Sequence, residues 1–353
     1  MKEIAIRPAW TIQDADGAAL SMRLIELLVQ VHAQGSLLMA AKQMGVSYRH
    51  AWDLVRQGEA QFGAPLLHME RGKGSTLTEL GEKIVWADHR IHARLKPSLD
   101  TLASELAAEL GRALRESAPL LRLHAGHGFA VERLRRDGLR TELTYGNCST
   151  AAAAVHDGEC DVAGFHLPIG PMQDVVLAHY AQWLGGEDLT VIDIATRRQG
   201  LMVRAGNPKE VFSLADLQRE DVRFINRQAG SGTRLLLEAL MKAGGFPSAA
   251  IAGFEHGEYT HAAVAAYVAS GMADVGFGLE TPARQDFVPL ASERYFLLCR
   301  SPLVATPVLQ QVLAALRDPG FKQLLDALPG YDGAIAGQVL KLEEAFAALS
   351  GLG

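Results

Sequence analysis

The sequence predicts an α/β protein that carries a separate all-α, winged-helix unit at its N-terminal end. In the first hundred residues, apolar side chains recur three or four positions apart, which is the period of amphipathic helices. Over residues 117–353, short apolar runs alternate with helical segments, which is the pattern of an α/β domain. Charge divides the chain at the same place, because residues 1–116 are neutral and residues 117–353 carry the whole net charge of −6.

Composition excludes several classes of protein. The chain has 353 residues, of which 48% are hydrophobic and 21% charged, and this length suits two or three domains of about 100–200 residues each. A disordered chain and a disulfide-stapled miniprotein are both excluded by this balance. A sequence pI near 6.1 argues against a protein that coats nucleic acid without selection.

Cysteine usage and hydropathy predict the compartment. Cys148, Cys160 and Cys299 form no CxxC pair and no cluster with histidines at ligand spacing, so we expect reduced thiols and no metal site. No stretch reaches the roughly 18 apolar residues that a membrane span needs, and the first residues hold no apolar run of signal-peptide length. We therefore expect a cytoplasmic protein with no membrane partner.

The N-terminal region predicts two helices joined by a tight turn. After a helix over 20–31, Ser36 is placed to cap a short helix over 37–44, and Ser47 is placed to cap a longer one. Between them, Gly45 occupies the position where the turn needs a positive φ. This is the helix-turn-helix arrangement, whose second helix enters the major groove of DNA. An ordinary α-hairpin is the alternative.

The expected DNA contacts lie on the second of these helices and on a wing. Two short apolar runs flank a tip rich in Gly, Lys and Arg, as in a β-wing that reaches for the DNA backbone. Residues 36–76 hold five basic and three acidic groups, and the helix can donate to phosphates and base edges from its N-terminal end. The expected DNA-binding residues are Ser36, Ser47, Tyr48, Arg49, His50, Arg56, Arg71 and Lys73.

These residues resemble a known DNA-binding domain. The run over 35–52, followed by Pro65-Leu66 and by residues 77–81, resembles the winged-helix domain of the ModE group of molybdenum-responsive repressors, which is similar to that of LysR-type regulators. Residues 47–52, with the sequence Ser-Tyr-Arg-His-Ala-Trp, are the most ModE-like part. The tip over 71–74 is shorter than the glycine-rich wing that the group often has.

A leucine stripe follows the expected wing. Along a predicted long helix over 79–114, leucines recur three or four positions apart, and Pro97 should kink or split this helix. Because a palindromic operator calls for a twofold protein, we favour burial of the stripe against a second copy, in a homodimer or higher homo-oligomer. The alternative is packing on the chain's own second domain. The stripe consists of Leu95, Leu99, Leu102, Leu106 and Leu110.

Small polar residues follow the expected strands of the second half, where an α/β sheet binds its ligands. The most informative loop, residues 226–234, ends in Gly-Ser-Gly-Thr-Arg and leads straight into a predicted helix. Glycines, hydroxyls and free N–H groups at a helix start favour an anion, although a simple loop is the alternative. The GxxxxGK[ST] spacing of nucleotide-hydrolysing loops is missing. Strands are expected over 120–124, 142–145, 161–165, 221–225, 274–277 and 296–299.

No catalytic constellation is visible in the sequence. Ser149 and Ser231 lack the G-x-S-x-G elbow, and no two histidines have HxxxH or HExxH spacing. We therefore expect no enzymatic activity, no catalytic residues and no cofactor. His127 and His261 are the histidines that we place in loops beside the expected cleft.

Five segments of the second half resemble one sensor domain. Residues 196–208, 224–236, 260–265, 270–276 and 289–295 are similar to the periplasmic-binding-protein-like domain found fused to ModE-type helix-turn-helix units or to molybdopterin-biosynthesis proteins of the MoeA type. The resemblance implies a type II periplasmic-binding-protein-like architecture, with two α/β lobes that close on a small ligand. Residues 126–128 are Gly-His-Gly where relatives tend to have Ser-His-Asp. The implied cleft residues are His127, Asn147, Ser149, Arg198, Ser231, Gly232, Thr233, Arg234, Thr260, His261, Glu293 and Tyr295.

Three parts are expected along the chain. They are a winged helix-turn-helix DNA-binding domain over 1–78, a linker or dimerisation helix over 79–116 and a ligand-sensing domain over 117–353. Within the sensor, we expect one lobe at about 117–195 and 296–353 and the other at about 196–295.

The hypothesis is a ligand-responsive bacterial transcription regulator that binds double-stranded operator DNA and a small-molecule effector. The resemblance implies molybdate, tungstate or a molybdenum-cofactor species as the effector, with control of molybdoenzyme or transport genes. Two alternatives stay open. One is the same regulator sensing a small carboxylate such as formate, and the other is an enzyme of molybdopterin metabolism.

Overall fold

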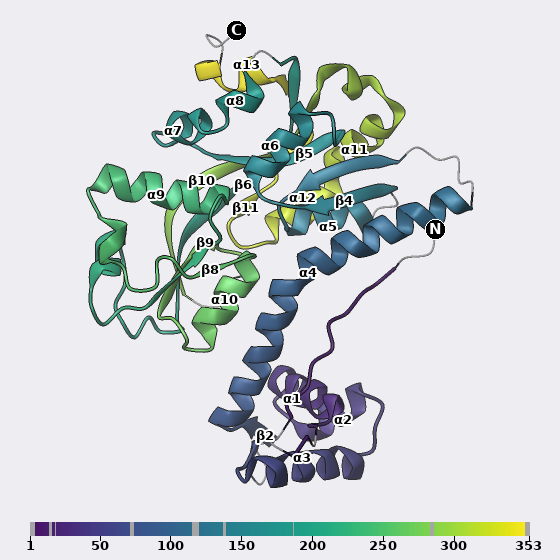
Figure 1. Ribbon diagram of the computed structural model, residues 1–353, viewed down its shortest axis with the longest axis vertical. Helices are drawn as coiled ribbons and strands as arrows, with labels where there is room; N and C mark the ends of the chain where they lie inside the picture. The colour runs from purple at the N-terminus through teal and green to yellow at the C-terminus, as the bar shows by residue number, and fades with distance from the viewer. Residues whose placement is uncertain are drawn as a thin grey trace. The chain divides into compact units, whose positions relative to one another are not determined.

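The chain folds into two compact units (Figure 1). The computed structural model describes residues 4–13, 16–17, 19–70, 74–114, 120–136, 139–185, 187–282 and 286–349. One unit is Arg7–Leu95, and the other consists of Met1–Ile6 with Lys96–Gly353.

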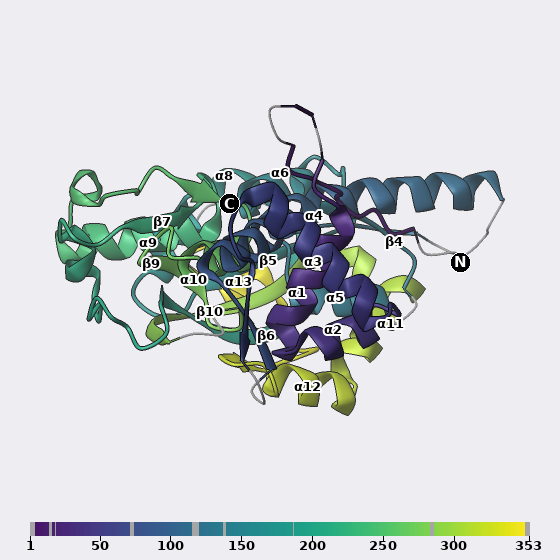
Figure 2. The same ribbon diagram turned by 90° about the horizontal axis from the view of Figure 1, so that it is seen from below.

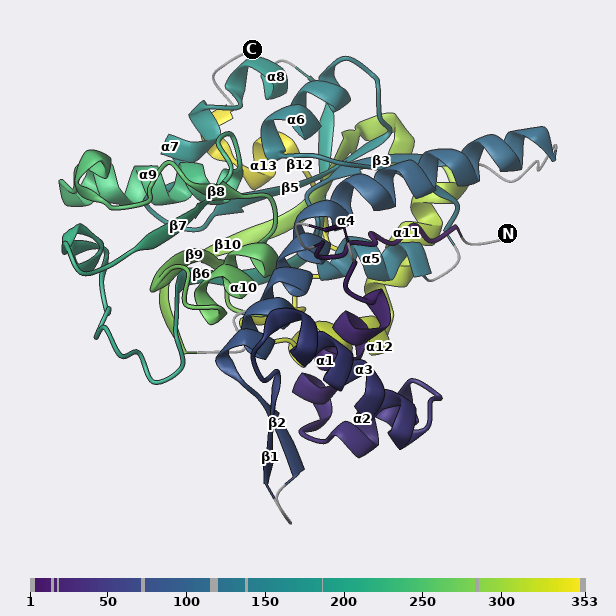
Figure 3. The same ribbon diagram turned by 60° about the horizontal axis from the view of Figure 1, so that its bottom comes forward.

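The N-terminal unit holds three helices and a hairpin. Figure 2 shows the helices together, and Figure 3 shows the hairpin as two antiparallel arrows. No single helix among the residues described is long and apolar enough to cross a membrane, and α1 with α2 meets that test only as a pair bent by 118°. The elements are α1 (Met22–Gln34), α2 (Leu37–Gln43), α3 (Tyr48–Phe62), β1 (Leu67–Glu70) and β2 (Gly74–Leu77).

The predicted caps and turn are confirmed. The side chain of Ser36 accepts a hydrogen bond from the Met39 N–H, and that of Ser47 accepts one from the His50 N–H at 3.1 Å. Each cap satisfies an N–H group that has no partner inside its helix. Gly45, in the turn between the helices, has a φ of 68°. The local signals in the sequence therefore specify this helix-turn-helix correctly.

A glycine allows two helices of this unit to cross closely. A Cβ atom on Gly58 of α3 would lie 2.1 Å from Cδ2 of Leu24 on α1, so any larger residue there would force the Leu24 side chain to move. Leu24, Leu27 and Leu28 are almost fully buried in the core around this crossing. The orientation of α3, which carries the expected DNA contacts, thus depends on the small residue at position 58.

A long helix, α4 (Glu79–Ala113), follows the hairpin. Pro97 lies inside α4, which continues through it, so of the two predicted outcomes the split does not occur and the kink stays a prediction. A proline removes one hydrogen bond of the ladder, and the turns on both sides keep theirs. The boundary between the two units, at Leu95 and Lys96, falls next to this proline.

The second half of α4 packs on the edge strand of the sensor sheet through small polar residues. Ser104 accepts a hydrogen bond from the Leu143 N–H at 2.7 Å and donates one to the Thr141 carbonyl at 3.2 Å. Thr101 accepts from the Tyr145 N–H at 3.0 Å. The side chains of α4 therefore bond backbone groups that a strand would otherwise pair. The leucines of the other face are exposed: Leu102 is 50%, Leu106 45% and Leu110 56% accessible.

One continuous ten-stranded sheet forms the frame of the larger unit. Its order is β4-β3-β5-β10-β6-β9-β7-β8, and β11 and β12 also pair with β6. The strands are β3 (Leu121–Ala125), β4 (Thr141–Tyr145), β5 (Val162–Pro168), β6 (Leu189–Val203), β7 (Phe224–Arg227), β8 (Gly257–Glu258), β9 (Val275–Leu279), β10 (Phe287–Arg300), β11 (Tyr331–Asp332) and β12 (Val339–Lys341).

Two long antiparallel strands, β6 and β10, connect the two lobes of this unit. β10 pairs with β5 of the first lobe over Glu293–Cys299, whereas β6 pairs with β9 of the second lobe over Gln199–Val203. Both strands also pair with each other along most of their length. The lobes thus share backbone hydrogen bonds rather than a flexible linker.

The helices cover the sheet separately in each lobe (Figure 1). Around β3, β4 and β5 lie α5 (Phe129–Arg136), α6 (Cys148–His156), α7 (Gln173–Ala178), α8 (Ala181–Leu184), α11 (Pro307–Arg317), α12 (Pro319–Asp326) and α13 (Leu342–Ala345). With β7 and β9 lie α9 (Gly232–Gly244) and α10 (His261–Ala269). Single 3₁₀ turns are found at Leu214–Gln218, Ser248–Ala250, Ser301–Ala305 and Ala347–Leu349.

The sequence located most strands but missed the longest one. The six expected strands correspond to β3, β4, β5, β7, β9 and the end of β10, and β7 begins later than expected, at Phe224. The 15-residue strand β6 was not expected at all. Its middle, residues 196–200, is Thr-Arg-Arg-Gln-Gly, whose polar character is typical of a loop. These polar residues are tolerated because they lie where the strand passes from one lobe to the other.

Candidate functional site

Half of the expected DNA contacts, the four residues at 47–50, lie at the start of α3. Tyr48, Arg49, His50 and Arg56 are all exposed. Ser36 and Ser47 are the caps of α2 and α3. Arg71 and Lys73, expected on the wing, lie outside the described residues. This arrangement presents donors at the N-terminal end of α3, and the contacts themselves stay predictions.

Three helices of the larger unit begin around the seam between the lobes. Asn147, Ser231 and Thr260 are the N-caps of α6, α9 and α10, and each side chain accepts from a backbone N–H three residues further on. α6 belongs to one lobe and α9 to the other, yet the Asn147 amide nitrogen lies 3.2 Å from the Cβ position of Gly230. Helix N-termini with free N–H groups thus meet at this seam.

Glu293 is the centre of a buried polar cluster at the seam. Its carboxylate accepts from the Arg197 guanidinium and the Gln199 amide, and it lies 2.8 Å from Nδ1 of His166. Burial alone would raise the pKa of Glu293, but Arg197 and His166 lower it to about 2. The Arg197 guanidinium also lies 4.2 Å from the centre of the Tyr295 ring. Glu293 is therefore a buried carboxylate held in its ionised form.

Arg227 is a buried arginine without a counter-charge of its own. Its Nε donates to the Glu258 carbonyl at 3.2 Å and its Nη2 to the Tyr259 carbonyl at 2.9 Å. Its third nitrogen, Nη1, is buried and has no hydrogen-bond partner among the residues described. Burial, and then repulsion from Arg197, lower the pKa of Arg227 to about 10. A buried donor of this kind calls for an acceptor, which the described residues do not supply.

His261 adds a neutral donor to this cluster. Its Nδ1 accepts from the Leu279 N–H at 3.2 Å, so the ring proton belongs on Nε2. Burial, and then Arg227 and Arg197, lower the pKa of His261 well below its ordinary value. Glu293 pairs with Arg197 and leaves Arg227 without a carboxylate partner among the described residues. This unpaired buried guanidinium favours an anion.

The structure brings most of the expected cleft residues together and leaves two out. Arg198 is 51% exposed and pairs with Glu280 at 2.7 Å, because neighbours on a strand point to opposite faces and Arg197 takes the buried one. Arg234 pairs with Glu238 at 2.8 Å and Glu255 at 2.9 Å. The residues at or next to the seam are His127, Asn147, Ser149, Ser231, Gly232, Thr233, Thr260, His261, Glu293 and Tyr295.

The sequence analysis missed three buried polar residues of the seam. Arg197, Arg227 and Gln199 lie inside the seam, and none of them was expected there. Arg197 and Gln199 are two positions apart and would have been found if β6 had been predicted as a strand. His166, on β5, carried no signal in the sequence that separates it from the other histidines.

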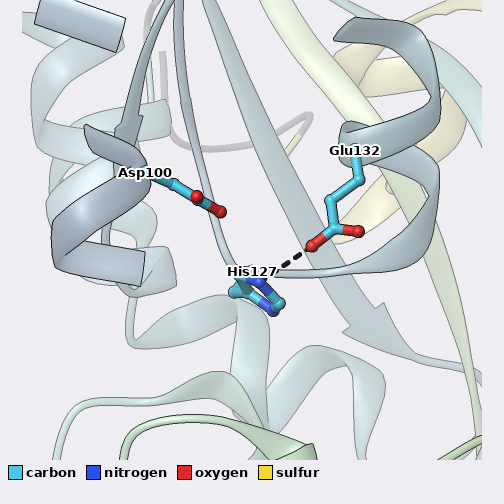
Figure 4. Close-up of side chains that lie close together, drawn as sticks. All are labelled: Asp100, His127 and Glu132. Carbon is cyan, nitrogen blue, oxygen red and sulfur yellow. Dashed lines mark ion pairs between the residues drawn. The ribbon is translucent and has the colours of Figure 1, made fainter. Parts of the chain in front are cut away.

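Three potential metal ligands lie close together around His127. Oxygen and nitrogen atoms of Asp100, His127 and Glu132 come within 4.8 Å of one another, and Nε2 of His127 lies 3.0 Å from Glu132 (Figure 4). The ammonium of Lys96 already pairs with both carboxylates, at 3.0 Å in the case of Glu132. Burial would raise the pKa of Glu132, but His127 and Lys96 lower it to about 2. Lys96 thus supplies the positive charge that a cation would bring.

Comparison with known proteins decides the family. Residues 131–317 match the PBP superfamily domain. The chain belongs to the PBP superfamily. Residues 22–82 match the bacterial regulatory helix-turn-helix proteins of the lysR family. The chain thus joins a LysR-type helix-turn-helix domain to a two-lobed PBP-like α/β domain, and the predicted fold class is confirmed.

The relatives are partial matches. The chain is 32% identical to YvgK of Bacillus subtilis (strain 168) over 189 residues, which are 53% of this chain and 61% of YvgK. It is 27% identical to the molybdenum transport protein ModE of Azotobacter vinelandii over 154 residues, 42% of this chain and 55% of ModE. The chain therefore spans less than two thirds of either relative. The crystal structure of CbnR, a LysR family transcriptional regulator, aligns at 18% identity and a TM-score of 0.39 over 84% of this chain and 99% of CbnR.

Proposed function

We propose that the protein is a LysR-type transcriptional regulator whose α/β domain binds a small oxyanion at the seam between its lobes. The observation that carries this proposal is buried Arg227, whose Nη1 has no acceptor in the described parts of the chain. Further groups for an anion are the neighbouring helix N-termini, the Nε2–H of His261 and the Tyr295 hydroxyl, which has no hydrogen-bond partner among the described residues. Such a protein binds and signals, and it needs no catalytic residue.

Molybdate or tungstate is the effector that we propose first. Each is a small tetrahedral oxyanion that accepts hydrogen bonds from many directions, as a site of arginine, imidazole and backbone donors requires. The similarity to ModE, a molybdenum transport protein, supports the same choice. The target genes would then be those for molybdoenzymes or transport.

Formate is the second candidate, and one observation favours it. Glu293 pairs with Arg197, and Arg227 is the arginine of the seam that it does not pair with. A small carboxylate carries one negative charge and matches this single unpaired guanidinium.

The DNA-binding part of the proposal rests on α3 and α4. We propose that Tyr48, Arg49, His50 and Arg56 contact operator DNA in the major groove, with Ser36 and Ser47 positioning the two helices and Arg71 and Lys73 on the wing. We further propose that the helix over 79–116 pairs with that of a second copy, between a DNA-binding domain over 1–78 and a sensor over 117–353. A protein that acts on DNA in this way works in the cytoplasm.

Calorimetry of the full-length protein tests the effector. We expect molybdate, tungstate or formate to bind, and Arg227→Gln to weaken that binding by about 2–5 kcal/mol, because it removes a buried charged donor. Arg198→Gln is the matched control, since Arg198 is exposed and paired with Glu280, and it should bind as the wild type does. Circular dichroism would show that both variants are folded. Equal weakening by both variants, or no binding by any of the three anions, contradicts the proposal.

A further inference from the structure

Cys148 lies at the seam in surroundings unlike those of the other two cysteines. It is the first residue of α6 and is 5% exposed. The free N–H groups at the start of a helix favour a negative charge, and here that charge would be a thiolate. Position alone does not make a cysteine reactive, so its neighbours decide the matter.

Cys148, His166 and Glu293 form a row of three groups. Sγ of Cys148 and Nε2 of His166 both lie 3.2 Å from the Cβ position of Gly232, so the thiol and the imidazole are neighbours, and Nδ1 of His166 lies 2.8 Å from Oε2 of Glu293. His166 and Glu293 lie on the neighbouring strands β5 and β10, whose register fixes their separation. A sulfur nucleophile, an imidazole and a carboxylate in sequence form the arrangement that activates a thiol in enzymes.

The proton of this pair belongs on the imidazole. Burial would lower the pKa of His166, but Cys148 and Glu293 raise it to about 9. Burial would raise the pKa of the Cys148 thiol, but His166 outweighs it and lowers that pKa below its ordinary value. By contrast, burial raises the pKa of Cys160 to about 11 and that of Cys299 to about 12. Cys160 and Cys299 are therefore internal controls.

Groups on other elements also face the sulfur. The hydroxyl of Tyr180, a fully buried residue, has no hydrogen-bond partner among the residues described, and burial, followed by the neighbouring Cys148, raises its pKa. Arg227 on β7 and Tyr295 on β10 lie within electrostatic reach of the sulfur. From the opposite lobe, Gly232 covers it, since a Cβ there would lie 3.2 Å from Sγ and 2.7 Å from Cε1 of His166.

We propose that Cys148 is a nucleophilic thiolate that soft electrophiles modify when the lobes part. With hydrogen peroxide, sulfur forms a bond to one oxygen, the O–O bond breaks, and the departing hydroxide takes the His166 proton and leaves as water. The product is a sulfenic acid. With an alkyl halide, an S–C bond forms and the halide leaves. In both cases the added atoms occupy the space under Gly232, so a modified protein cannot close its seam.

Mass spectrometry of the full-length protein tests the chemistry. At neutral pH, we expect iodoacetamide and, in a separate arm, hydrogen peroxide to modify Cys148 on the order of tenfold faster than Cys160 or Cys299. The rate at Cys148 should reach its plateau below the ordinary thiol pKa of about 8.5. An equal rate at all three cysteines, or a midpoint at or above that value, overturns the proposal. Reaction with one reagent alone identifies which class of electrophile the site accepts.

Two variants separate activation from access. His166→Gln should move the midpoint of the Cys148 rate upward by at least one pH unit, because the thiolate loses its imidazolium. His156→Gln, on the same helix but paired with Glu187, should leave the midpoint unchanged. If His166→Gln does not fold, the pH profile of the Cys148 modification rate in the wild type is the test.

The effect on regulation rests on the proposed function, and its failure can be distinguished. Alkylated protein should lose at least tenfold in affinity for whichever of molybdate or formate the wild type binds, and either anion should slow alkylation of Cys148. If neither anion binds but Cys148 reacts as described, the proposed effector is wrong and the thiolate stands. If an anion binds and Cys148 is inert, the thiolate proposal is wrong alone.

Discussion

Glu293 shows how a single residue sets the electrostatics of the seam. It is 1% exposed. Its carboxylate contacts Arg197 and Gln199 on β6 and His166 on β5. Removing it would leave Arg197 buried with a diminished counter-charge. The ionised carboxylate therefore keeps two otherwise repelling cations, Arg197 and His166, in one place.

Acid should lower the free energy of unfolding through protonation of Glu293. The pKa of Glu293 is about 2 when folded, against an ordinary value of 4.5, so the folded chain binds fewer protons than the unfolded chain between these values. Stability from this group is present above pH 4.5 and is lost as the pH falls toward 2, by about 3 kcal/mol.

Denaturant unfolding at a series of pH values measures this loss. Glu293→Gln should be less stable than the wild type at neutral pH, and the difference should shrink as the pH falls through the same window, because a protonated glutamate resembles glutamine. Glu255→Gln, at an 81% exposed position, should follow the wild-type curve. A difference that stays constant with pH contradicts the assignment.

Residue-level prediction from sequence succeeded where the signal is local. Asn147, Ser231 and Thr260 were implied as cleft residues by the resemblance to the sensor domain, and all three are N-caps at the seam. The resemblance implied Arg198, whereas the buried arginine is its neighbour Arg197, on the other face of β6. That difference depends on strand register, which adjacent residues do not encode by themselves.

At the scale of elements, α4 closes the edge of a sheet with its side chains. β4 is the last strand in the order, and its N–H groups at Leu143 and Tyr145 donate to Ser104 and Thr101 of the helix. A sequence shows hydroxyls on one face of a helix, but it does not show that they replace the next strand of a sheet. This contact therefore escaped prediction.

Ser104→Ala should destabilise the larger unit by about 1–3 kcal/mol. The substitution leaves the buried Leu143 N–H without an acceptor, which costs its desolvation. Ser98→Ala, at an exposed position of the same helix, is the matched control and should change the free energy of unfolding by less than about 0.5 kcal/mol. Equal effects of the two substitutions in urea unfolding would mean that helix propensity, rather than the hydrogen bond, is responsible.

At the scale of the whole molecule, the exposed leucines of α4 bear on assembly. Its small residues, such as Ala103 and Ala108, are buried, while Leu102, Leu106 and Leu110 are about half exposed. Apolar residues in a row on a surface mark an interface more often than chance exposure does. The leucine stripe predicted from the sequence is thus exposed and can pack against a second copy of the chain.

Leu106→Glu should convert a dimer into monomers. A charge at the centre of the leucine row would be buried in the interface without a counter-charge, and association would weaken. Sedimentation at several protein concentrations measures the change, with Leu324→Glu on α12 as the control for an exposed leucine outside the row. A wild-type chain that is monomeric at all concentrations, or a variant that still dimerises, removes α4 from the interface.

The sharing of β6 and β10 by both lobes also governs the order in which the chain can fold. Val162 on β5 pairs with Cys299 on β10. Residues 204–286, which contain the core of the second lobe, are synthesised before any of β10. Until then, β5 has an open edge, and closing so long a loop is entropically costly. A ribosome-bound chain must therefore complete the inserted lobe before the outer one. An arrested synthesis anywhere in the second lobe leaves an unpaired strand that is prone to aggregate.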